Sequence, residues 1–130
     1  MGSELPIGSE PVATVARFNL WTLEWNARGL GPFRRDYWNA PIFSPARGAF
    51  AFSDPQPLTG AVFHVLTLLG IGATVAYALI LLGALALNGV AAARLLDGVG
   101  VGFVPASLGG ALMVALPFVA NELGVLQLMM

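Results

Sequence analysis

The sequence predicts an all-α membrane protein in which a polar arm precedes a membrane-embedded part. Hydrophobic residues make up 57% of the chain and charged residues only 10%, whereas a soluble chain of this size needs more charge to cover its surface. The charges are also unevenly placed, because residues 58–96 contain a single one, Arg94. We therefore divide the chain into an arm, residues 1–57, and a membrane part, residues 58–130.

The arm is expected to begin with an amphipathic helix over about residues 11–28. Ser9 suits the N-cap position, Glu10 places an acid near the start, and Pro11 fits the first turn of a helix. Gly29 supplies a stop, because glycine is the usual residue just beyond a helix C-terminus.

An uncharged polar line should run along this helix between two apolar surfaces. Asn19, Thr22 and Asn26 follow one another at helical spacing, and Trp21 and Trp25 belong to an aromatic strip beside them. Two interpretations stay open for this line. It forms ordinary hydrogen bonds to neighbouring segments, or Asn19 and Asn26 face a polar ligand such as a sugar.

The rest of the arm predicts an ordered loop. Five prolines within residues 31–57 oppose a long helix or a regular sheet, yet the segment is too rich in aromatic residues for a disordered linker. Trp38 could stack on a sugar ring, and Arg34 and Arg35 could bind phosphate. The alternative is that these arginines pair with Asp36 or with lipid headgroups.

The membrane part predicts three helices separated by glycines. Residues 58–69 form a short interfacial helix, too short to span, and residues 73–95 form a transmembrane helix. A glycine-rich turn over 97–102 leads to a second transmembrane helix over about 105–121, with a kink at Pro117. The last two helices form a transmembrane hairpin.

Small residues are placed where this hairpin would need them. Gly89 and Ala93 are four residues apart on the first helix, and Ala106 and Gly110 are four apart on the second. Lipid offers helices no hydrophobic reason to associate, so close approach at small side chains is the usual means of packing. We predict that these four residues form the helix contact.

Several classes of site are absent from the sequence. The chain has no cysteine, which excludes disulfides and thiolate metal sites. Its net charge of −1 gives no basic surface for nucleic acid. His64 is the one histidine and has no neighbour at metal-ligand spacing, so we predict no metal site and identify no cofactor. The expected partners are the lipid bilayer and other membrane subunits or helices.

Four segments of the chain resemble one group of proteins. They are residues 19–26, 36–43, 50–60 and 121–128. Together they resemble the N-terminal portion of large bacterial polytopic membrane proteins of the GT-C glycosyltransferase type, which use polyprenyl-phosphate sugars. The resemblance covers nearly the whole chain, but the family's first transmembrane helix has no counterpart before Glu10.

The resemblance implies a location and candidate catalytic groups. It places the arm on the extracytoplasmic side of the bacterial inner membrane, with the turn beside Arg94 in the cytoplasm. Family members carry an acidic residue in their first loop as base or acceptor-orienting group. Glu10 matches it best in position, and Asp36 and Asp54 are the other candidates, although local turn bonds would also explain the two aspartates.

Two functions follow from the sequence. The first is a fragment or short relative of a GT-C-like glycosyltransferase, whose arm contributes to a sugar-lipid site and which is not active alone. The alternative is a small accessory subunit without catalysis that packs against a larger membrane complex. A third hypothesis is a truncated reading frame without a function of its own.

Overall fold

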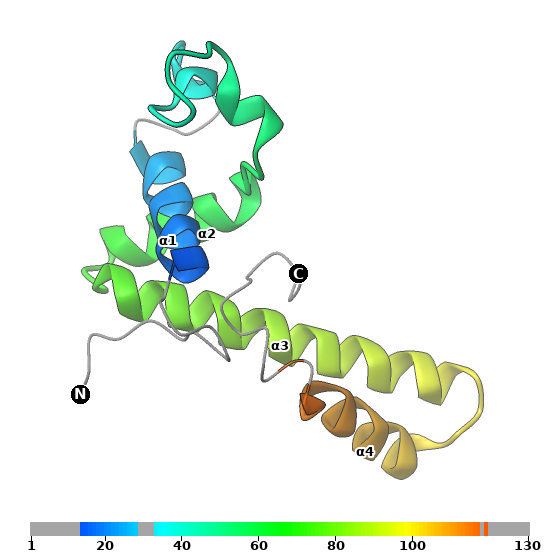
Figure 1. Cartoon of the computed structure of the whole chain (residues 1–130). Helices are drawn as coiled ribbons and strands as arrows, with labels where there is room; N and C mark the ends of the chain where they lie inside the picture. The colour runs from blue at the N-terminus through cyan, green and yellow to red at the C-terminus, as the bar shows by residue number, and fades with distance from the viewer. Residues whose placement is uncertain (1–13, 29–32, 118, 120–130) are drawn as a thin grey trace. The chain divides into compact units, whose positions relative to one another are not determined.

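A computed structural model describes residues 14–28, 33–117 and 119, and these are helical with no strand among them (Figure 1). This confirms the all-α prediction for the described part of the chain. The elements in order are α1 (Thr14–Ala27), the 3-10 helices η2 (Tyr37–Asn39) and η3 (Ala49–Phe52), α2 (Pro57–Leu68), α3 (Ala73–Gly98) and α4 (Phe103–Val114).

The chain forms two compact units. The first contains residues 17–80, and the second contains residues 81 onward together with residues 14–16. The long helix α3 contributes to both units.

The first unit is built around an aromatic cluster between α1 and the loop that follows it. Trp25, Tyr37 and Phe50 are buried together, and the ring of Phe50 meets those of Trp25 and Tyr37 edge to face at 6.4 and 5.2 Å. The indole Nε1 of Trp25 also donates to the backbone carbonyl of Tyr37 at 3.0 Å. Aromatic side chains from α1, η2 and η3 therefore hold the proline-rich loop against the helix.

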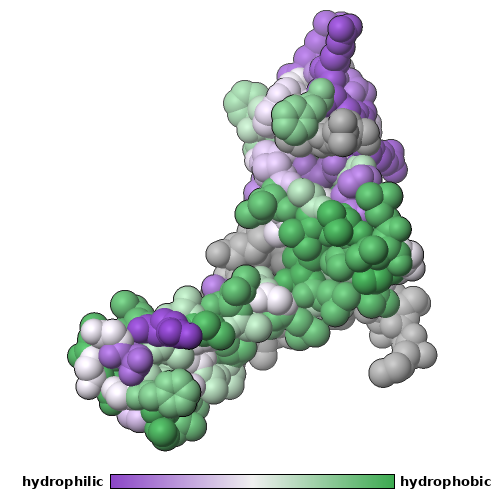
Figure 2. Space-filling model, turned by 180° about the vertical axis from the view of Figure 1, so that it is seen from behind, coloured by the Kyte–Doolittle hydropathy of each residue, from purple (hydrophilic) through white to green (hydrophobic). Residues whose placement is uncertain are grey.

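The helix α2 carries an exposed apolar face. Gly60 and Phe63 are buried, whereas Leu58, Val62 and Val65 are exposed. The space-filling view shows this apolar surface over α2 (Figure 2). No charged residue lies within α2, so one face of this short helix is apolar and unprotected by charge.

Glycine sets the C-terminal ends of α2 and α3 in the same way. Gly70 and Gly100 adopt φ values of 84° and 89°, a region that residues with a Cβ rarely occupy. After each glycine, a backbone N–H donates a hydrogen bond to a carbonyl oxygen of the preceding helix. These bonds run from Ile71 N to Leu66 O and from Val101 N to Leu96 O, both at 3.1 Å. These are the bonds of a Schellman motif.

The end of α3 differs from the sequence prediction, and the helix that follows it is broken. Since the glycine that terminates α3 is Gly100, the helix continues to Gly98 and the predicted turn residue Asp97 is helical. The helix α4 begins at Phe103 and ends at Val114, and residues 117 and 119 are helical again, so the helix is broken just before Pro117, where a kink was predicted, and the predicted end near residue 121 lies outside the described residues. Pro117 explains the break, because proline disfavours a helical conformation in the residue before it and cannot donate to the preceding turn.

One helix among the described residues, α3, is long and apolar enough to cross a membrane. Its 26 residues correspond to about 39 Å, more than the roughly 30 Å of a hydrocarbon core. The helix α4 has only 12 residues, or about 18 Å. In the described part of the chain a long helix is thus followed by a short one, and because the predicted second span reaches residue 121, beyond the described residues, the hairpin of two spanning helices stays a prediction.

Candidate functional site

Asn26 is the centre of a buried polar network in the first unit. Its Nδ2 donates to the Thr22 carbonyl at 2.9 Å and to the carbonyl of Pro55. Its Oδ1 accepts a 2.7 Å bond from the hydroxyl of Tyr37. Gly60 lies directly beside this side chain, since a Cβ added there would be 2.2 Å from Asn26 Cβ. One amide thus joins α1, η2 and the start of α2.

Asn19 belongs to the same interior. It is fully buried, and its Oδ1 accepts a 3.3 Å bond from Gln56 Nε2. Gln56 is itself buried at the N-terminus of α2 in a left-handed conformation, with a φ of 47°. Asn19, Thr22 and Asn26 therefore face the interior of the unit and bond to neighbouring segments, as the first of the two interpretations expects, while a contact of Asn19 and Asn26 with a sugar stays a prediction. Buried amides need partners, and segments distant in sequence supply them.

Arg34 and Asp36 neutralise each other at the surface. Arg34 donates to both carboxylate oxygens of Asp36, from Nε at 2.9 Å and from Nη2 at 2.6 Å. The guanidinium also lies 4.5 Å from the ring centre of Trp25. Its hydrogen bond lowers the pKa of Asp36 and raises the pKa of Arg34. Asp36 is consequently a weak base, and the local ion pair explains both residues without a catalytic role.

Tyr37 gives the polar network a dependence on pH. Burial raises the pKa of Tyr37 above its usual value near 10, because a buried phenolate loses its hydration. A raised pKa in the folded state means that the stabilising contribution is complete below pH 10 and is lost as the pH rises through the folded-state pKa. Deprotonation would also remove the donor that Asn26 Oδ1 requires.

We therefore expect the first unit to lose stability at alkaline pH through Tyr37. Urea unfolding followed by tryptophan fluorescence at pH 8 and pH 11 measures this loss. Tyr37→Phe should be less stable at pH 8 and should show a smaller difference between the two pH values. An unchanged difference in Tyr37→Phe would assign the alkaline effect to other groups.

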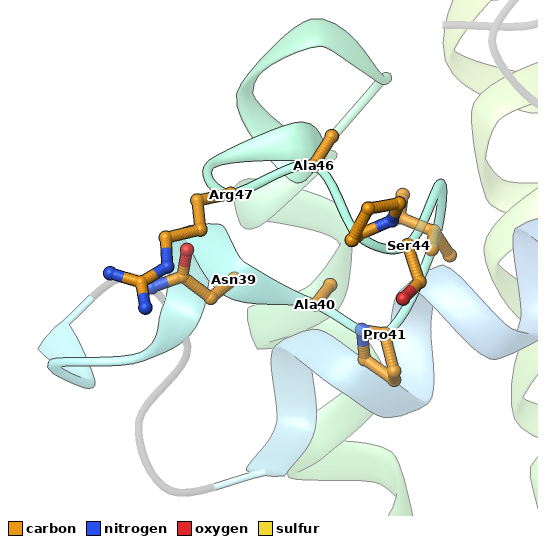
Figure 3. Close-up of a pocket in the computed structure, with 8 residues that line it drawn as sticks. Asn39, Ala40, Pro41, Ser44, Ala46 and Arg47 are labelled. Atoms are coloured by element: carbon orange, nitrogen blue, oxygen red, sulfur yellow. The ribbon is translucent and has the colours of Figure 1, made fainter.

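A polar pocket lies in the loop between η2 and η3. It encloses about 290 Å³ and is lined by residues 39–42 and 44–47. Figure 3 shows Asn39 and Arg47 at one end of this pocket and Ser44 at the other. Asn39 Oδ1 accepts a 2.9 Å bond from Gly48 N, which leaves its amide Nδ2 as a donor. No acidic residue lines the pocket.

The remaining predicted ligand-binding residues are exposed at the surface. The side chain of Trp38 is 45% exposed, and its ring meets the buried ring of Tyr37 edge to face at 4.7 Å. Arg35 is exposed as well, but it is not among the residues that line the pocket. Sequence reasoning missed Arg47, the arginine that does line it. The signal was an arginine beside Gly48 in an ordered loop, where glycine allows a φ of 70°.

Three of the four predicted packing residues meet in the second unit. A Cβ added at Gly110 would lie 2.3 Å from the Gly89 carbonyl oxygen and 2.9 Å from Ala93 Cβ. Ala106 is buried one turn earlier on α4. The backbones of α3 and α4 thus approach each other where side chains are smallest, and Figure 1 shows α4 returning beside the C-terminal part of α3.

The structure describes two of the three other residues that the sequence singled out. Glu10 lies outside them. Asp54 is exposed, and His64 is half-buried on α2, where its carbonyl accepts a bond from Thr67. The described part of the chain contains no group of three or more histidine or acidic side chains that would hold a metal ion.

Comparisons with known proteins add no relative. No family model matches the chain, and neither a curated protein nor a solved structure matches it.

Proposed function

We propose that this protein is an integral membrane protein, anchored by α3, that acts as a non-catalytic accessory subunit of a larger membrane complex. The observation that carries the proposal is the surface of α3. Its most apolar window has a mean hydropathy of 2.1, and only 22% of that window is buried. Such a surface needs lipid or apolar protein around it.

Several polar side chains of the first unit are engaged in hydrogen bonds or an ion pair within it, which supports a non-catalytic role. Asn19 and Asn26 bond within the first unit, and Asp36 is paired with Arg34. A general base must be free to accept a proton from the substrate. Asn19, Asn26 and Asp36 hold their polar groups in structural bonds, which suits a subunit that contributes shape and surface.

Two arginine substitutions on α3 test the membrane anchor. Leu87 and Leu95 are 71% and 70% exposed, but Leu87 lies near the middle of α3 and Leu95 near its end. An arginine at the centre of a spanning helix costs about 3 kcal/mol of insertion free energy, and much less near the end. We expect Leu87→Arg to reduce the fraction that resists alkaline carbonate extraction, and Leu95→Arg to retain it. Equal behaviour of both variants would contradict a spanning α3.

Gentle solubilisation tests the accessory role. Native mass spectrometry of the protein extracted from its own membranes in mild detergent should show a complex of defined stoichiometry with other membrane subunits. A chain that is monomeric under these conditions, and still embedded in the membrane by the extraction test, would overturn the accessory role while leaving the anchor intact.

The loop pocket favours a second candidate, a contribution to a sugar-lipid site of the GT-C kind. Arg47 and the free Nδ2 of Asn39 provide donors for a phosphoryl group, and the exposed Trp38 offers a ring for a sugar. We expect Arg47→Gln to weaken binding of a short-chain isoprenyl phosphate about tenfold, the loss of one charge-assisted contact. The matched control Arg35→Gln should bind normally, and weaker binding by that variant alone would exclude the pocket.

A further inference from the structure

Two adjoining cavities in the second unit form a groove along α3 and α4. The first, of about 290 Å³, is lined by Arg94 and Asp97 on α3 and by Phe103 on α4, among others. The second, of about 340 Å³, extends along both helices from Gly110 toward Val114. They share Val90, Ala93 and Ser107, so the charged cavity adjoins the apolar one.

The groove has the polarity of a lipid. The apolar cavity begins at Leu85, and Arg94 lines the other end of the groove. The helical rise between these two residues is about 14 Å, close to the depth of one leaflet of a hydrocarbon core of about 30 Å. Figure 2 shows hydrophilic side chains together with an aromatic ring at the end of the hairpin. An acyl chain along the groove would place its headgroup beside Arg94.

Arg94 and Asp97, the two charged residues at this end of the groove, are available to a ligand. Among the described residues, neither the Arg94 nor the Asp97 side chain has an ion-pair or hydrogen-bond partner. The hydroxyl of Ser107, in contrast, donates to the Phe103 carbonyl at 2.8 Å. A guanidinium binds phosphate well, and a carboxylate binds a primary ammonium group. This end of the groove therefore presents one guanidinium and one carboxylate, which together complement a zwitterionic headgroup.

We propose that this groove binds one phosphatidylethanolamine molecule, with its phosphate on Arg94, its ammonium on Asp97 and an acyl chain over Val90. The proposal rests on the membrane anchoring proposed above. It selects against an anionic headgroup, which would bring no cation to Asp97. It also selects against phosphatidylcholine, whose quaternary ammonium cannot donate a hydrogen bond to the carboxylate.

Native mass spectrometry of the full chain in lipid mixtures tests the site. The protein is equilibrated with phosphatidylethanolamine, phosphatidylglycerol or phosphatidylcholine, and the fraction that retains one lipid is measured. We expect phosphatidylethanolamine to be retained most. Arg94→Gln should weaken its retention about tenfold. Asp97→Asn should remove the preference over phosphatidylcholine while leaving retention of phosphatidylglycerol unchanged or stronger.

A second pair of variants tests the acyl chain. Val90 lines both cavities, so Val90→Phe should fill the groove and reduce retention without changing a charge. Leu87 lines neither cavity, and Leu87→Phe is the matched control that should bind normally. Equal retention of the three lipids, or no effect of Arg94→Gln and Val90→Phe, would leave only non-specific surrounding lipid and overturn the site. Failure of the anchor itself would instead appear in the extraction test on Leu87→Arg and Leu95→Arg.

Discussion

Replacing Gly110 with alanine is expected to separate α4 from α3. The new Cβ would lie 2.3 Å from the carbonyl oxygen of Gly89 and 3.1 Å from the backbone nitrogen of Ala93. Both atoms belong to the α3 backbone, which cannot move aside as a flexible side chain can. Overpacking of this kind costs about 1–3 kcal/mol, and here the cost falls on the contact that joins the two helices.

Spin labels provide the measurement, because the chain has no cysteine. Labels on Leu87→Cys and Leu112→Cys, two exposed positions on α3 and α4, would report the distance between the helices. We expect this distance to become longer and more broadly distributed in Gly110→Ala. Gly83→Ala is the matched control, since a Cβ at Gly83 meets nothing within 4 Å. An unchanged distance in Gly110→Ala would show that the helices tolerate a wider crossing.

The second large effect is expected for Asn26→Leu in the first unit. This change removes the acceptor for the Tyr37 hydroxyl and the donor to the Thr22 and Pro55 carbonyls. Each buried polar group left without a partner costs about 1–3 kcal/mol. Leucine is also bulkier at its branch point, beside the close approach of Gly60. We expect a loss of about 2–4 kcal/mol in the free energy of unfolding.

Tryptophan fluorescence can follow this loss, because all three tryptophans lie in the first unit. Asn39→Ala is the comparison, since Asn39 is exposed and makes a single side-chain hydrogen bond. Its cost should stay below about 1 kcal/mol. Tyr37→Phe combined with Asn26→Leu should lose less than the sum of the two single changes, because both break the same bond. Additive losses would contradict direct coupling of these side chains.

The positions of the helices could be predicted from the sequence because their causes are local. A long and predominantly apolar run of residues predicts α3, and glycines with positive φ end α2 and α3. The end of α3 was predicted too early, because the glycine that terminates the helix is Gly100 and not Gly98. The break after α4 was also encoded locally, in Pro117, where a kink was predicted.

The candidate site was less predictable, because its bonds join distant residues. Arg34 and Asp36 are close in sequence, and the ion pair was one of the two interpretations left open. Arg47 was missed, because Gly48, the local signal beside it, does not show that the loop will fold into a pocket around the arginine.

The sequence by itself determined the apolar character of the chain, the presence of a helix long enough to span and the small residues Gly89 and Gly110. Each of these depends on residues within a few turns of one another. Only the tertiary structure decided that Asn19 and Asn26 face inward, because their partners Gln56 and Pro55 are 37 and 29 residues away. A polar side chain on a helix has the same local signal whether it meets a ligand or a buried amide. The fold decides which by bringing the partner to it.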